Sequence, residues 1–140
     1  MKPIEFFKNN EQLKERMEYW KPILGLSDWE IAIKLATREE MANPNYAGQC
    51  SSNHIQKSAV IFIRSDAKES SKDAYFKQYQ EQVLIHELLH CKLLLFEDET
   101  YEEAITETYH HALIEDMAKA LFFAKYNMSI KDMVKELPEW

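Results

Sequence analysis

The stretch that decides the fold is Val83-Leu84-Ile85-His86-Glu87-Leu88-Leu89-His90-Cys91. It predicts a helix, because apolar residues recur about every 3.6 positions in this part of the chain. Residues four apart share one face of a helix, so the imidazoles of His86 and His90 can point at one ion. Glu87 lies about 100° further round the helix and can lean over that ion without binding it. Apolar neighbours such as Ile85 argue against a freely solvated pair of surface histidines, which is the alternative.

A zinc ion is the metal that this H-E-x-x-H pattern favours. Neutral imidazole is a good zinc ligand, and a catalytic zinc needs three protein ligands and an open position for water. The third ligand is therefore expected later in the chain. A metzincin would continue with Gly and His at positions that are Leu93 and Phe96 here, so that continuation is absent.

The segment that follows supplies carboxylates instead, and here the chain resembles the thermolysin-type gluzincins. In that family an N-E-x-x-S-D segment follows H-E-x-x-H, the Glu binds zinc and the Asp orients a histidine ligand. The resemblance implies that Glu103 is the third ligand and that Glu107 orients a histidine, with Thr106 at the hydroxyl position. Glu102 stands where the family has Asn and is a rival ligand. Thr100 and Glu103 also match a capping box, so a helix cap is the alternative role of Glu103.

The resemblance covers mainly residues 83–110 and extends to small stand-alone zincin-like proteins of bacteria and phages, including the peptidases that destroy prophage repressors. It implies a metallopeptidase that hydrolyses a peptide bond of an intracellular protein or peptide through a zinc-activated water. One zinc per chain and Glu87 as the general base belong to that expectation. His110 and His111 are candidates for stabilising an oxyanion, as a separate histidine does in thermolysin-like enzymes. The alternative is that both are ordinary surface or partly buried histidines.

The remaining sequence predicts one α+β domain over residues 1–140. The expected helices cover about 10–20, 73–95, 100–124 and 129–137, and the expected strands cover 29–35, 48–54 and 58–64. This order favours helices gathered on one face of a small antiparallel or mixed sheet, which is the minimal zincin-like core. Tyr109 and the aromatic residues Trp20, Trp29 and Phe122 are expected in the core.

Composition narrows the partners and the compartment. The chain carries a formal net charge of -7, with 46% hydrophobic and 29% charged residues, which is ordinary for a soluble globular protein. An acidic chain repels phosphate, so a peptide or protein substrate is expected rather than nucleic acid. The longest apolar runs, at 59–63 and 120–124, are too short to cross a membrane. We expect a cytoplasmic protein in which Cys50 and Cys91 are free thiols.

Two other functions are compatible with parts of the sequence. The first is a non-catalytic zinc module with the same fold. The second is a di-iron helical protein, because Glu87-x-x-His90 and Glu107-x-x-His110 are two Glu-x-x-His pairs. That protein would need four long helices and would leave the strands at 29–35 and 58–64 unexplained.

Overall fold

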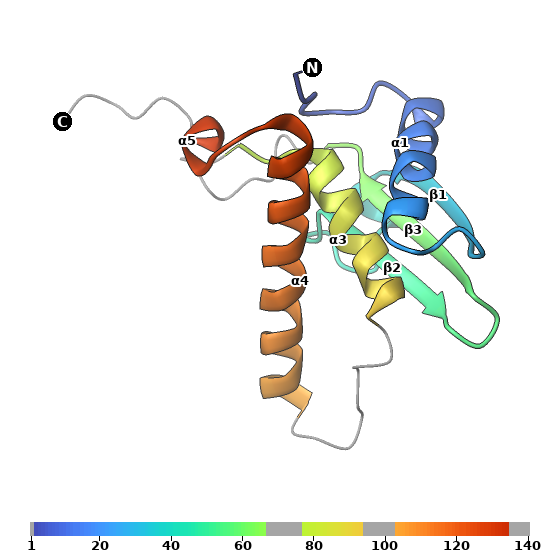
Figure 1. Cartoon of the computed structure of the whole chain (residues 1–140). Coiled ribbons are helices and arrows are strands. Elements are labelled where there is room, and N and C mark those ends of the chain that lie inside the picture. The colour runs from blue at the N-terminus through green and yellow to red at the C-terminus, as the bar shows by residue number, and fades with distance from the viewer. Residues whose placement is uncertain (1, 67–76, 94–102, 135–140) are drawn as a thin grey trace.

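The computed structural model describes residues 2–66, 77–93 and 103–134, without the side chains of residues 103–108. Its α+β order confirms the expected fold class (Figure 1). The elements are α1 (Asn10–Ile23), β1 (Glu30–Ala36), the short 3-10 helix η1 (Arg38–Glu40), β2 (Gly48–Asn53), β3 (Ser58–Arg64), α3 (Gln80–Lys92), α4 (Glu103–Tyr126) and α5 (Ile130–Met133). The three strands exclude a four-helix bundle for the described part of the chain.

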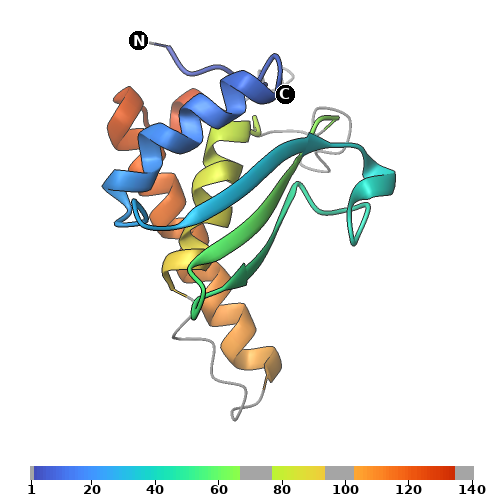
Figure 2. The same ribbon diagram turned by 90° about the vertical axis from the view of Figure 1, so that its right-hand side faces the viewer.

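The sheet is mixed and has the strand order β1-β3-β2. β1 runs parallel to β3, and β2 runs antiparallel to β3 with Gly48 opposite Ile63. α1 and α3 lie on the same face of the sheet (Figure 1 and Figure 2). Side chains alternate along β3, so that Ile61 is fully buried under these helices and Val60 on the other face is 46% exposed.

The core lies between the sheet, α1, α3 and α4. α4 contributes Ile114, Ala118 and Phe122, which are fully buried and four residues apart. The expectation for Tyr109 is wrong, because this residue is 73% exposed. Tyr109 precedes Ile114 by five residues, which places it about 140° round the helix from the buried face.

α3 begins later than the periodicity predicts. Residues 77–79 are not helical, and Tyr79 has extended backbone angles. The N–H of Lys77 donates to the carbonyl of Met133, and the N–H of Gln80 donates to the carbonyl of Glu5. These distant partners replace the hydrogen bonds of a helix. The expected start of the helix, at residues 73–76, lies outside the described residues.

α5 is shorter than expected. Ser129 and Asp132 form the predicted capping box, but the helix ends at Met133 because Val134 is extended. Residues 135–137, to which the prediction extended it, lie outside the described residues.

A buried carboxylate joins the three long helices. The side chain of Glu81 on α3 is fully buried and pairs with Arg16 of α1 and Lys125 of α4. It also accepts hydrogen bonds from the indole N–H of Trp20 at 3.0 Å and from the hydroxyl of Tyr126. Because these partners come from different helices, Glu81 sets how α4 lies along α3.

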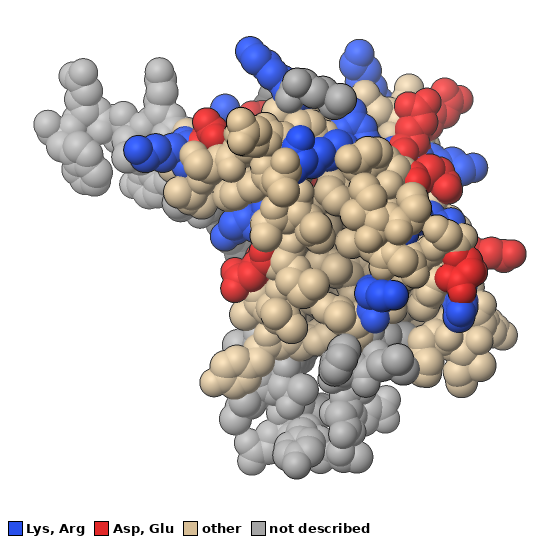
Figure 3. All heavy atoms as spheres, in the orientation of Figure 1, with Lys and Arg blue, Asp and Glu red and all other residues tan. Residues whose placement is uncertain are grey.

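The charged side chains on the face seen in Figure 1 are scattered, with Lys and Arg interspersed with Asp and Glu (Figure 3). Among the described helices, none combines the length and the apolar character that crossing a lipid bilayer requires.

Candidate metal centre

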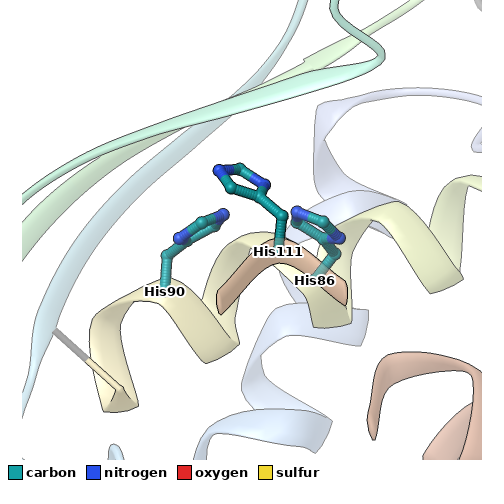
Figure 4. A group of neighbouring side chains, drawn as sticks. All are labelled: His86, His90 and His111. Atoms are coloured by element: carbon teal, nitrogen blue, oxygen red, sulfur yellow. The ribbon is translucent and has the colours of Figure 1, made fainter. Parts of the chain in front are cut away.

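Three histidines from two helices converge on one space. His86 and His90 lie one turn apart on α3, and His111 reaches them from α4 (Figure 4). Their ring centroids are 5.0 Å apart for His86 and His90, and 5.1 Å apart for His90 and His111. One ligand nitrogen from each ring lies within 4.8 Å of the others. Small side-chain rotations suffice to bring three such atoms onto one ion.

Glu115 stands behind His86, one turn after His111 on α4. Its Oε2 lies 2.6 Å from Nδ1 of His86, and its Oε1 accepts a hydrogen bond from Nε2 of Gln82 at 2.9 Å. A carboxylate at Nδ1 favours the tautomer that carries its proton there and leaves Nε2 for an ion. The contact also holds the orientation of the ring.

The protonation states suit a metal site. Burial lowers the pKa of His86, but the hydrogen bond to Glu115 and the charges of Glu87 and Glu115 outweigh it and raise that pKa above the ordinary value. The hydrogen bond from His86 lowers the pKa of Glu115, which is therefore ionised at neutral pH. Burial, followed by the charges of His86, His111 and His110, lowers the pKa of His90 to about 4. His90 is thus neutral at pH 7, as a metal ligand must be.

Glu87 occupies a tight and dry position beside the histidines. Its residue is 5% exposed, and burial raises the pKa of its carboxyl to about 7, with the charge of His86 opposing and that of Glu115 adding to the effect. The backbone of β2 lies directly against this side chain. A Cβ atom added to Gly48 would lie 3.1 Å from Cγ of Glu87 and 2.8 Å from Cγ1 of Val83. Only glycine allows the strand to approach so closely.

This donor set fits the expected zinc. Three imidazoles suit borderline ions such as zinc, whereas calcium and magnesium prefer oxygen ligands. A buried glutamate next to one ligand, with no need to bind the ion itself, completes the arrangement that the H-E-x-x-H pattern predicts.

The structure brings some of the predicted site residues together and leaves others undescribed. His86, Glu87 and His90 lie together as expected, and His111 joins them as a candidate ligand. The ring of His110 is partly buried, with its centroid 5.9 Å from that of His90. The side chains of Glu103 and Glu107 lie outside the described residues, as does Glu102 altogether. The roles predicted for these three residues stay predictions.

Sequence reasoning missed Glu115 and gave His111 a different role. A signal was present, because His111 and Glu115 are four residues apart, like Glu103 and Glu107. The same spacing occurs twice on α4, shifted by eight residues.

Comparison with protein-family models, with curated proteins and with solved structures finds no match to this chain.

Proposed function

We propose that the chain is a zinc-dependent metallopeptidase that holds its ion through His86, His90 and His111. The observation that carries the proposal is the convergence of these three imidazoles beside the buried Glu87. Glu115 supports the set by holding His86 in the tautomer that a metal requires.

The third ligand is where this proposal departs from the gluzincin resemblance. Glu103 precedes His111 by eight residues, which is about 12 Å along a helix. The two residues are therefore alternatives and not joint ligands of one ion. His111 is favoured because its ring lies beside those of His86 and His90.

Glu87 is the proposed general base. A bound zinc ion would supply a Lewis acid that lowers the pKa of a water molecule and polarises a carbonyl. Glu87 would take the proton of the attacking water and pass it to the amine that leaves. A pKa of about 7 suits both transfers, since the carboxylate must accept a proton and release it again near neutral pH.

An extended peptide is the substrate that the sheet favours. Within the described residues, β1 and β2 are the edge strands. β2 is the edge beside the histidines, because Gly48 lies against Glu87 and Cys50 lies against Cys91 of α3. A peptide strand added to this edge would run past α3. Pairing of an edge strand with substrate also agrees with the zincin resemblance.

Metal analysis of purified variants tests the centre. We expect one zinc per chain in the wild type and in Glu103→Ala, and little zinc in His111→Ala. His54→Ala is a matched control, because it removes one exposed imidazole from the turn between β2 and β3. Loss of zinc in Glu103→Ala and not in His111→Ala would restore the gluzincin ligand set. Absence of zinc from the reconstituted wild type would refute the proposal.

Glu87→Gln tests catalysis. This variant should keep its zinc and lose about 10²- to 10⁴-fold in turnover, the usual contribution of a general base. A peptide library, read by mass spectrometry with and without the variant, needs no knowledge of the substrate. Cleavage at equal rates by both proteins would remove Glu87 from its role. A zinc protein that cleaves nothing would instead be the non-catalytic module.

A further inference from the structure

Two thiols far apart in the sequence face each other beside the metal centre. Sγ of Cys50 on β2 lies 3.6 Å from Sγ of Cys91 in the last turn of α3. Both are free cysteines; Cys91 is 2% exposed and Cys50 is partly exposed. A disulfide has an S–S distance of about 2.05 Å, so an approach of about 1.5 Å would close the bond.

The two thiols belong to the elements that carry the candidate site. Cys91 directly follows the ligand His90, so the two residues share one turn of α3. Cys50 comes two residues after Gly48, whose backbone lies against Glu87. A bond between the sulfur atoms would therefore join the strand over Glu87 to the turn that holds His90.

We infer that Cys50 and Cys91 are a redox pair, and that their oxidation to a disulfide weakens metal binding at His86, His90 and His111. The disulfide itself does not depend on the proposed function, whereas its effect on metal binding rests on that function. The expected oxidant is a small-molecule disulfide of the glutathione type.

The reaction balances as two thiol–disulfide exchanges. Sγ of Cys50, the more accessible thiol, attacks the oxidant RSSR, forms Cys50–S–S–R and releases one RSH. Sγ of Cys91 then attacks Sγ of Cys50, which forms the protein disulfide and releases the second RSH. Two electrons pass from the protein to the oxidant, and the two thiol protons leave on the two RSH molecules.

Closing the bond should distort the site because both elements can yield. β2 is an edge strand that pairs only with β3 among the described strands, and Cys91 lies next to the last residue of α3. The approach of about 1.5 Å would be shared between them. Metal sites hold their ligand distances to within about 0.2 Å, so a displacement of His90 by a few tenths of an ångström lowers the affinity.

The test uses the purified chain with oxidised glutathione as the oxidant. Metal-free and zinc-loaded samples are incubated with it, alkylated, and analysed by intact mass and peptide mapping. Zinc affinity is then measured by competition with a chromophoric chelator, before and after reduction. Cys50→Ser, at the partly exposed position, is the control that least disturbs packing, and Cys91→Ser is the second control.

The inference predicts a Cys50–Cys91 disulfide and a loss of zinc affinity of about tenfold or more, reversed by reduction and absent from Cys50→Ser. Failure to form this disulfide in the folded protein would overturn the redox pair. A disulfide that leaves zinc affinity unchanged would overturn the effect on the metal. If neither form binds zinc, the proposed function and the coupling both fail, and disulfide formation in the same samples still decides the redox pair.

Discussion

Replacing Glu115 by alanine should weaken zinc binding while leaving all three candidate ligands in place. The wild-type carboxylate lies 2.6 Å from Nδ1 of His86, which is the distance of a charge-assisted hydrogen bond. Losing a partner of this kind usually costs about 10- to 100-fold in metal affinity, or about 1.4–2.7 kcal/mol. The side chain of Glu115 is 47% exposed, so water can replace part of the lost contact. We therefore expect a loss nearer to tenfold.

Chelator competition measures this effect directly, and a neighbouring carboxylate gives the control. Asp116→Asn removes the same charge one residue along α4, at an exposed position that faces away from His86. Glu115→Gln keeps an acceptor oxygen and loses the charge, so its affinity should lie between those of the wild type and Glu115→Ala. Equal affinities for Glu115→Ala and Asp116→Asn would refute the idea that Glu115 orients His86.

Three further predictions concern the surroundings of the site. Gly48→Ala should lower peptidase turnover by about ten- to a hundredfold with zinc content unchanged, because the new Cβ would press on Glu87; unchanged turnover would show that the approach of β2 is not needed. Glu81→Gln should cost about 3 kcal/mol of unfolding free energy in a denaturant titration, since it leaves two cations without their buried partner. Glu15→Gln, an exposed change on α1, should cost almost nothing, and equal costs would contradict the role of Glu81. In the metal-free protein His90, with a pKa of about 4 against 6.5, favours folding when neutral, so its contribution is lost as pH falls from 6.5 towards 4; NMR titration of its ring near pH 6.5 would contradict this.

The parts of the fold that could be predicted are those with a local signal. β3 occupies Ser58–Arg64 as expected, because a run of branched apolar residues there is bounded by a turn in which Lys57 has a positive φ. The face shared by His86 and His90 follows from their spacing alone. The start of α3 could not be predicted, because distant backbone groups of Glu5 and Met133 hold the segment before it.

The third ligand could not be predicted for a similar reason. Glu103 and His111 are eight residues apart, which is about 80° round a helix, so periodicity does not separate them. The choice depends on how far α4 is shifted along α3, and contacts between residues distant in sequence decide that shift. Glu81 meets Lys125 across 44 positions, and Gln82 meets Glu115 across 33.

Apolar packing alone would not define this shift. The buried residues of α4, Ile114, Ala118 and Phe122, repeat every four positions, so moving the helix by one turn again places apolar side chains against α3. The polar contacts do not repeat in this way. A slip of one turn would separate Lys125 from Glu81 and would also take Glu115 away from His86, leaving a buried carboxylate without its partners. Because a buried, unpaired charge is costly, the contacts at both levels select one register. In that register His111, and no other described residue of α4, completes the group formed by His86 and His90.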